Sequence, residues 1–321
     1  MTFDLRGKRV FLAGHRGMVG SALVRRLGGE NCQPQIVGRE IADLRNQDAV
    51  FRWFDEQRPE AVFVAAARVG GIHANDTRPG DFLYDNLAIE TNVIEAARRI
   101  GVQKLVFFGS SCIYPRLAAQ PISESALLSG PLEPTNQWYA IAKIAGLKLC
   151  EAYRRQLACD FVSMMPTNLY GPGDNFDLAT SHVLPALMAK IHDAVQCGQG
   201  TVEIWGSGRP RREFLHVDDL ADAAVFLMRT WSDDEHVNIG TGEDVTIAEL
   251  AELIARIIGF DGRFVFDRSK PDGTPRKLLD VSKLSSLGWR YRIDLETGIR
   301  QTYRWYLKAK ADQSEMLRER A

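Results

Sequence analysis

Short apolar runs alternate with longer amphipathic segments through the first half of the chain. The runs contain few polar interruptions, which is typical of strands buried on both faces of a sheet. The predicted strands are Lys8–Ala13, Gln35–Gly38, Glu60–Ala67, Gln103–Phe108 and Asp160–Met165, and the predicted helices are Asn46–Gln57, Asp81–Arg99 and Asn136–Leu157. Strands that alternate with helices predict an α/β fold built on a doubly wound parallel sheet with helices on both faces.

Beyond Gly173 this alternation weakens. The predicted elements there are helices at Ser181–His192 and Thr246–Ile258, strands at Val202–Trp205 and Phe264–Phe266, and a helical tail from Leu295 onward. Thr246 and Glu249 have the spacing of a capping box, which supports the start of the second helix. We therefore expect a smaller second α/β domain in this half of the chain.

Composition narrows the class of protein. Of 321 residues, 45% are apolar and 25% are charged, as in ordinary globular proteins. A net charge of -1 gives no global basic field, so neither nucleic acid nor a membrane is expected as a partner, whereas a local site for a phosphate stays open. The N-terminal stretch lacks the apolar core of a signal peptide. The five cysteines have no CxxC spacing, which argues against a disulfide framework or a zinc site and favours the cytoplasm.

A glycine-rich turn follows the first strand and leads into a helical pattern. This order of strand, glycine turn and helix is the context that a dinucleotide-binding fingerprint requires. We expect Gly14 to permit the tight turn, Gly17 to let the backbone approach a pyrophosphate, and Gly20 to let helix and strand pack closely. The residues of this loop expected to bind cofactor are Gly14, Arg16, Gly17, Met18, Val19 and Gly20. The spacing is GxxGxxG rather than GxGxxG.

Two arginines indicate which dinucleotide binds. Arg39 follows the second predicted strand, where an NAD-binding protein would carry an acid for the ribose diol. A guanidinium there would instead bind the 2′-phosphate of NADP, and Arg16 can reach the same phosphate. The pair favours NADP over NAD. The alternative is that Arg39 is a solvated turn residue.

The carboxyl ends of the predicted strands converge on one crevice, where ligands of such sheets bind. Ala65 to Ala67, Ser110 and the Pro166–Asn168 segment all fall there. We expect a Rossmann-type cofactor domain of residues 1–172, to which 213–245 returns, and a substrate domain of 173–212 and 246–321.

Tyr139 and Lys143 carry the candidate chemistry. One helical turn separates them, so both lie on the same face of the helix. A phenol has a pKa of about 10, and a nearby ammonium should lower it. Ser110 could hold a substrate oxygen or the phenol. Such a set passes a proton to or from an oxygen while hydride moves at the same carbon, whereas a half-buried tyrosine beside a solvated lysine is the alternative.

Several motifs together resemble one family from end to end. They are GHRGMVG, AAARVGGI, GSSCIYP, LEPTNQWYAIAKIAG, PTNLYGP, SHVLPAL, WGSGRPRREFLHVDD and KPDGTPRKLLD. The chain resembles the GDP-L-fucose synthases within the extended short-chain dehydrogenase/reductases. GSSCIYP and KPDGTPRKLLD are far more specific than the glycine loop or the YxxxK spacing.

The resemblance implies a two-step reaction. Members epimerise GDP-4-keto-6-deoxy-D-mannose at C3 and C5 and then reduce the C4 ketone with NADPH. Tyr139 and Ser110 would polarise the C4 oxygen, and Tyr139 would donate the proton during hydride transfer. Lys143 would hold the ribose, and Cys112 and His182 match the acid/base pair. Which of the two acts as base at each carbon stays open.

The resemblance also implies binding residues and an assembly. Further positions that match cofactor contacts are Asp43, Leu44, Ala65, Ala67, Phe108, Lys143, Pro166, Asn168, Leu169 and His182. Lys190, Trp205, Arg212 and Asp272 match positions that hold the GDP-sugar, and Lys190 replaces an expected arginine. The helices Asp81–Arg99 and Asn136–Leu157 would pair with a second copy in a homodimer, as in related enzymes.

Two alternatives differ in class from an NADP-dependent epimerase/reductase. A nucleotide-sugar 4-epimerase would hold NAD tightly with no net redox, but Arg39 and Cys112 speak against it. A non-catalytic sensor would bind the nucleotide only to regulate, and the intact set of Ser110, Tyr139 and Lys143 speaks against that.

Overall fold

A six-stranded parallel sheet forms the centre of the larger lobe. The computed structural model describes residues 2–270 and 272–318. The strand order is β2-β1-β3-β4-β5-β9, with bounds Gln33–Gln35 (β2), Arg9–Ala13 (β1), Ala61–Val64 (β3), Lys104–Phe108 (β4), Phe161–Pro166 (β5) and Val237–Ile239 (β9). The order reverses between β1 and β3, as in a doubly wound sheet. The predicted fold class is confirmed.

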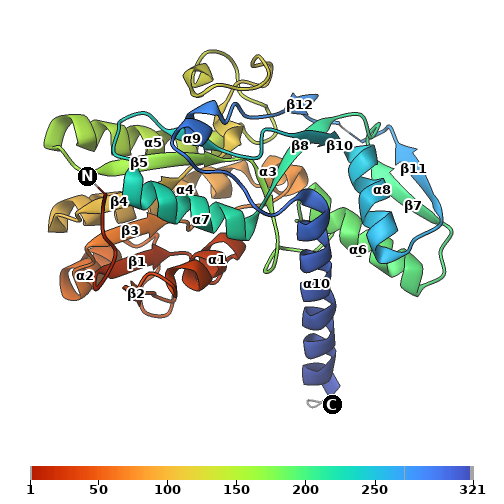
Figure 1. The fold of residues 1–321 in the computed structure, drawn as a ribbon, viewed down its shortest axis with the longest axis horizontal. Helices are drawn as coiled ribbons and strands as arrows, with labels where there is room; N and C mark the ends of the chain where they lie inside the picture. The colour runs from red at the N-terminus through yellow and green to blue at the C-terminus, as the bar shows by residue number, and fades with distance from the viewer. Residues whose placement is uncertain (1, 271, 319–321) are drawn as a thin grey trace.

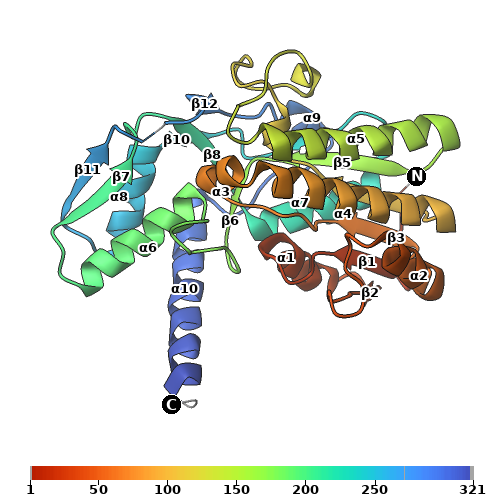
Figure 2. The ribbon, with the colours of Figure 1, turned by 180° about the vertical axis from the view of Figure 1, so that it is seen from behind.

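Helices cover both faces of this sheet. Figure 1 shows α1 (Met18–Leu27) and α7 (Val217–Thr230) on one face, and Figure 2 shows α2 (Gln47–Gln57), α4 (Pro79–Ile100) and α5 (Gln137–Leu157) on the other. Alternate residues of β1 enter separate cores. Val10 and Leu12 pack on the side of α1 and α7, whereas Phe11 packs with Trp53 and Phe54 of α2. Burial on both sides therefore explains the uninterrupted apolar runs.

The second lobe carries its own sheets and core. Strand β8 (Arg211–His216) pairs with β6 (Asn168–Tyr170), β10 (Asp244–Thr246) and β12 (Arg276–Lys277), and β7 (Thr201–Trp205) pairs with β11 (Arg263–Asp267). Helices α6 (Val183–Gln196) and α8 (Ile247–Ile258) pack together, and the side chains of Thr246 and Glu249 form the predicted capping box. Helix α10 (Leu295–Arg318) projects from the body in Figures 1 and 2.

Short elements complete the chain. They are α3 (Ile72–Thr77), the 3₁₀ turns Ser111–Ile113 and Glu124–Ala126, and α9 (Ser282–Ser286).

Glu213 of β8 is fully buried, and its carboxylate accepts hydrogen bonds from the backbone of Thr241, Gly242 and Leu279. Burial raises the pKa of this carboxyl group while those bonds oppose the shift. One side chain thus joins three segments that are distant in sequence.

The prediction for the second strand is wrong in its bounds. Strand β2 spans Gln33–Gln35 rather than Gln35–Gly38, because the Gly38 carbonyl accepts hydrogen bonds from the amides of Ile41 and Ala42 and so begins a turn. Strand β2 is also an exposed edge strand, where the apolar pattern is weakest. Arg39 consequently lies in a turn beyond the strand.

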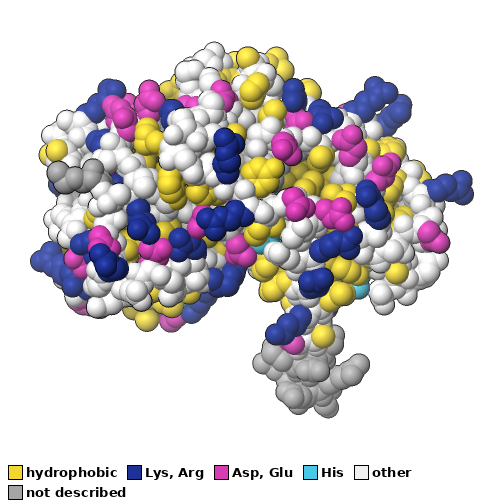
Figure 3. Space-filling view, viewed as in Figure 1, with side chains coloured by type: hydrophobic (Ala, Val, Ile, Leu, Met, Phe, Trp, Pro, Cys, Tyr) yellow, Lys and Arg dark blue, Asp and Glu magenta, His cyan; other side chains and the backbone are white. Residues whose placement is uncertain are grey.

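The surface carries mixed charge. Figure 3 shows lysine and arginine side chains interspersed with aspartate and glutamate on the face viewed in Figure 1. Over residues 2–270 and 272–318, we find no helix that combines the length and the apolar character needed to cross a membrane. All five cysteines are free thiols.

Candidate active site

The glycine loop joins β1 to α1 against the carboxyl end of β3. Gly14 has a φ of 90°, and a Cβ there would lie 2.8 Å from the Cα of Ala66. A Cβ on Gly20 would overlap the Gly14 carbonyl, so neither position has room for a side chain. Gly17 is the N-cap of α1 and supplies no side-chain hydrogen bond to it. The first-turn amides of α1 can therefore serve a phosphate.

The arginines near the loop are exposed and partly engaged with acids. The Arg16 guanidinium lies 3.0 Å from the Glu40 carboxylate, and Arg39 precedes that acid in the same turn. Asp43 binds Arg45 at 2.6 Å, and these hydrogen bonds lower the pKa of the Asp43 carboxyl group to about 2. Arg16 and Arg39 lie on the solvent side of the loop, where a phosphate could replace Glu40 as the anionic partner.

Ser110, Tyr139 and Lys143 come together at the end of β4. Ser110 caps the turn Ser111–Ile113 by accepting a hydrogen bond from the Cys112 amide at 3.2 Å. Lys143 is 2% exposed and donates to the Phe108 carbonyl at 2.9 Å. Its Nζ lies 5.8 Å from the centroid of the Tyr139 ring. The predicted face of α5 therefore does point at the end of β4.

The electrostatic environment of Tyr139 differs from the sequence expectation. Burial raises the pKa of its phenol, the Cys112 and Glu90 charges add to the increase, and a hydrogen bond with Ser110 opposes it. The expected lowering by Lys143 is absent because that ammonium forms an ion pair with Glu90 at 2.8 Å. Without cofactor or substrate, Tyr139 is accordingly held in its neutral form, which can donate a proton.

Cys112 lies beside two donors that the sequence interpretation did not assign. Lys277 Nζ contacts the Cys112 sulfur at 3.3 Å, and Asn136 Nδ2 contacts it at 3.4 Å. These three residues line one small pocket together with Glu133 and Thr274. A charged donor stabilises a sulfur atom that carries negative charge. The arrangement suits a thiol that exchanges protons.

His182 is the N-cap residue of α6 and lies within range of the Lys277 charge. The preceding loop is tied to the β3 side by a hydrogen bond from the Gly71 amide to the Thr180 carbonyl at 2.9 Å. Solvent still reaches His182, but the surrounding protein and then the Lys277 ammonium lower the pKa of its imidazole. Lys277 therefore acts on both candidate acid/base groups.

The predicted sugar-nucleotide residues lie along the second lobe. Lys190 Nζ is 5.2 Å from the Trp205 ring centroid, and Trp205 is 51% exposed. Lys270, which the sequence analysis did not single out, lies at 5.3 Å from the same ring. Asp272 accepts hydrogen bonds from the Ser207 amide and hydroxyl at 2.6 and 2.8 Å. An aromatic face flanked by ammonium groups can bind a base and a diphosphate.

Arg212 connects this surface to the crevice. Burial lowers the pKa of its guanidinium, while the nearby charges of Cys112 and Asp272 favour the cationic form. Asn168, on the strand β6 that pairs with β8, donates to the Glu213 carbonyl at 2.8 Å, so its amide is oriented by β8. Ala65 and Ala67 lie in the segment after β3 that packs against Gly14, and Pro166 ends β5.

Besides Lys270, three residues of the site were missed or left without a role. Asn136 and Lys277 stand inside the two motifs LEPTNQWYAIAKIAG and KPDGTPRKLLD, so motif membership could have identified them. Glu90 offered no such signal, because an acid on an amphipathic helix is normally a solvated residue. Its burial depends on the packing of α4 against α5.

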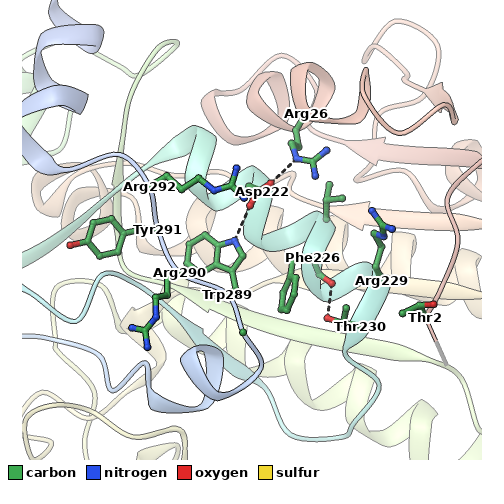
Figure 4. Close-up of a pocket in the computed structure, with 12 residues that line it drawn as sticks. Thr2, Arg26, Asp222, Phe226, Arg229, Thr230, Trp289, Arg290, Tyr291 and Arg292 are labelled. Atoms are coloured by element: carbon green, nitrogen blue, oxygen red, sulfur yellow. Dashed lines mark hydrogen bonds and ion pairs between the residues drawn. The ribbon is translucent and has the colours of Figure 1, made fainter.

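A larger cavity of about 540 Å³ lies elsewhere, between α7 and the segment from Gly288 to Arg292 (Figure 4). None of the predicted site residues lines it. Asp222 within it binds Arg26 at 2.8 Å and the Trp289 indole at 2.9 Å. Among residues 2–270 and 272–318, no group of three His, Cys, Asp or Glu side chains is placed to hold a metal ion.

The fold and the site define a class of protein. A parallel sheet with a glycine loop, an uncapped helix start and a Ser–Tyr–Lys set fits a dinucleotide cofactor and describes a dehydrogenase or epimerase. The model of the NAD dependent epimerase/dehydratase family matches residues 10–240.

Known proteins narrow the class further. The chain is 56% identical over 308 residues to a GDP-L-fucose synthase of Sinorhizobium fredii, covering 96% of this chain and 98% of the relative. It superposes on a GDP-6-OMe-4-keto-L-xylo-heptose reductase from C. jejuni with a TM-score of 0.90 and 38% identity, covering 96% of this chain and 100% of the other. A GDP-L-fucose synthetase from Naegleria fowleri bound to NADP gives 0.88 and 30% identity, over 97% of each chain. The chain belongs to the NAD dependent epimerase/dehydratase family and, within it, to the GDP-L-fucose synthases. The resemblance inferred from the motifs is thereby confirmed.

Proposed function

We propose that this protein converts GDP-4-keto-6-deoxy-D-mannose to GDP-L-fucose by epimerisation at C3 and C5, followed by reduction of the C4 ketone with NADPH. The observation that carries the proposal is that Cys112, with Lys277 at 3.3 Å from its sulfur, shares a turn with Ser110 at the end of β4, where Tyr139 also lies. The end of β4 thus combines groups that can donate a proton to an oxygen with a thiol that can take a proton from carbon.

Epimerisation depends on the acidity of the carbons next to the ketone. Ser110 and the neutral Tyr139 donate hydrogen bonds to the C4 oxygen and stabilise the negative charge that develops there. Cys112 and His182 remove and return the protons at C3 and C5. Lys277 stabilises the negative form of the thiol, and its effect on His182 keeps that imidazole neutral and able to accept a proton.

Reduction uses the same oxygen contacts. When NADPH is bound, it would supply the hydride for C4. Tyr139 then gives its proton to the alkoxide oxygen, while Ser110 keeps that oxygen in place. The Lys143 ammonium directs two of its three N–H groups to the Glu90 carboxylate and the Phe108 carbonyl. The third N–H can bind the ribose of the cofactor.

Binding groups lie on both sides of these reactive residues. The glycine loop, with Gly14, Gly17, Met18, Val19 and Gly20, holds the pyrophosphate, and Arg16 and Arg39 hold the 2′-phosphate. On the second lobe, Lys190 and Arg212 bind the diphosphate of the GDP-sugar, Trp205 packs against it, and Asp272 fixes the adjoining loop. A point charge from Lys190 takes the place of a bidentate guanidinium.

The decisive test is incubation of purified protein with NADPH and GDP-4-keto-6-deoxy-D-mannose, followed by identification of the sugar product. GDP-L-fucose supports the proposal. A reduced sugar with unchanged C3 and C5 would indicate a reductase alone. Exchange without NADPH oxidation would indicate an epimerase, and no turnover would favour a nucleotide-binding module.

The division of labour between the lobes is part of the proposal. Residues 1–172 with 213–245 form the cofactor domain, and residues 173–212 and 246–321 form the substrate domain, so the sheet of β6, β8, β10 and β12 in the second lobe contains strands from both domains. The position of β9 at the edge of the six-stranded sheet and the packing of α7 on α1 support it. Cytoplasmic residence is supported by five free thiols.

An Arg39→Ala variant should bind NADPH about 10- to 100-fold more weakly, because one charge-assisted contact to the 2′-phosphate is lost. NADH affinity should change little, since NADH lacks that phosphate. Fluorescence titration with both cofactors measures the difference. Arg52→Ala, an exposed change on α2, is the matched control. Equal affinity of the wild type for both cofactors would contradict the role of the arginines.

A homodimer should form through the outer surface of α4 and α5. Tyr84 is 70% exposed, and Trp138 and Ile141 are each 39% exposed on these neighbouring helices. Light scattering should give twice the monomer mass, and Ile141→Glu should shift the protein to monomer by placing a charge in the contact. Leu117→Glu, in a loop and 82% exposed, should leave the dimer intact. A monomeric wild type at micromolar concentration would rule the dimer out.

A further inference from the structure

A buried carboxylate stands behind the active-site lysine. Glu90 of α4 has a side chain that is 1% exposed, and its carboxylate lies 2.8 Å from Lys143 Nζ. Apart from this ion pair, neither carboxylate oxygen has a hydrogen-bond partner among the described residues. Lys143 is thus the single polar group that compensates a fully buried acid.

The helix interface is shaped for this contact. A Cβ on Gly146, less than one turn beyond Lys143, would lie 2.6 Å from a Glu90 oxygen. Only a glycine at position 146 leaves room for the Glu90 carboxylate beside α5. The Lys143 ammonium is held from the other side by the Phe108 carbonyl at 2.9 Å, and the Phe107 ring centroid lies 4.9 Å away. Its direction is therefore fixed by one charged and one neutral acceptor.

The pair is also placed to change charge under working conditions. Burial raises the pKa of the Glu90 carboxyl group to about 7, against the opposing effect of Lys143. Titratable groups of α5 that face Glu90 are Lys143, Tyr139 and Cys150, and its negative charge raises the pKa of the Tyr139 phenol and of the Cys150 thiol. An ionised Glu90 cancels the Lys143 charge at Tyr139, whereas a neutral Glu90 leaves that charge free to act.

We propose that Glu90 is a positioning residue for the reduction at C4: its carboxyl group aims the Lys143 ammonium and, by gaining or losing a proton, sets how strongly that ammonium acts on Tyr139. The proposal rests on the proposed function of Tyr139 as proton donor. A purely structural role would not require a group that can ionise at this position, because an apolar pair of the same size could fill the space.

The expected result is a pH profile that depends on Glu90. In the wild type, the rate of NADPH oxidation at saturating cofactor and substrate should fall on the order of 10-fold as the pH rises through about 7. The fall arises because ionised Glu90 makes Tyr139 a weaker acid. Glu90→Gln keeps an acceptor for Lys143 but cannot ionise, so its rate should stay at the low-pH level across that range.

The matched control is Glu95→Gln on the same helix. Glu95 pairs with Arg98 and accepts a hydrogen bond from Tyr153 of α5, so it also bridges α4 and α5 without contacting Lys143. This variant should keep the wild-type profile. A Glu90→Gln profile identical to the wild type, or a flat wild-type profile, would overturn the proposal. The wild-type profile decides the matter if Glu90→Gln does not fold.

Cofactor binding gives a readout that does not need turnover. When the Lys143 ammonium also binds the cofactor ribose, it stabilises the ionised Glu90 carboxylate less, and the pKa of Glu90 rises. The wild type should therefore take up part of a proton on binding NADPH near pH 7. Calorimetry in buffers of different ionisation enthalpy measures this uptake. Glu90→Gln should take up less, and titration of the cofactor phosphate cancels in the comparison. Equal uptake overturns the role of Glu90, whereas absence of GDP-keto-sugar reduction in the wild type overturns the proposed function alone.

Discussion

A Tyr139→Phe variant is expected to bind NADPH as the wild type does and to lose reduction of the C4 ketone by ~100- to 10,000-fold, the usual contribution of a general acid. The phenol is buried beside Ser110, and its raised pKa keeps it protonated until the alkoxide forms. A phenylalanine ring fills the same space but leaves the alkoxide without its proton donor. Stopped-flow measurement of NADPH oxidation reports the loss directly.

The control for this change is Tyr153→Phe. Tyr153 lies on the same helix and donates a hydrogen bond to Glu95 at 2.6 Å, so the variant removes a comparable hydroxyl outside the crevice. Its rate of reduction should stay close to that of the wild type. Reduction at an undiminished rate in Tyr139→Phe would show that another group protonates the C4 oxygen.

A Cys112→Ala variant is expected to exchange the C3 and C5 protons of the substrate with deuterated solvent ~100- to 10,000-fold more slowly. The thiol is the proposed proton carrier, and Lys277 and Asn136 both contact its sulfur. NADPH binding should persist, because Cys112 faces the pocket with Glu133 and Thr274 rather than the glycine loop. Mass spectrometry of the recovered sugar nucleotide measures the exchange.

Two further variants define this prediction. Cys197→Ala removes an exposed thiol just past α6 and should not affect exchange. Lys277→Met should slow exchange while keeping Cys112 in place, because the sulfur loses its charged donor. Unchanged exchange in Cys112→Ala would leave His182 or an unassigned group as the base.

Local signals in the sequence were sufficient for the parallel sheet. Strands β1, β3, β4 and β5 are buried on both faces, so each appears as a continuous apolar run. Strands of three residues or fewer, such as β6, β9 and β12, carry too few residues for any period to be visible. They exist because β8 and β5 supply partners from distant parts of the chain.

The candidate site likewise contains residues that local sequence predicts and residues that only tertiary packing brings in. Ser110, Tyr139 and Lys143 were predicted from a strand end and a helical spacing, and both features depend only on neighbouring residues. Lys277 was within a motif, yet its contact with Cys112 spans 165 positions of sequence. Glu90 gave no sequence signal at all, because its burial exists only once α4 packs on α5.

The sequence by itself therefore determined the α/β class and the glycine loop, and it predicted the candidate reactive groups. Periodicity and turn chemistry act between residues that are close along the chain, and they can be interpreted without coordinates. The tertiary structure alone decided the charge at the reaction centre. The pKa of Tyr139 is raised rather than lowered because burial, followed by the charges of Cys112 and Glu90, disfavours the phenolate, while the Lys143 ammonium pairs with Glu90. Those contributions come from different helices, and desolvation depends on everything packed around the phenol.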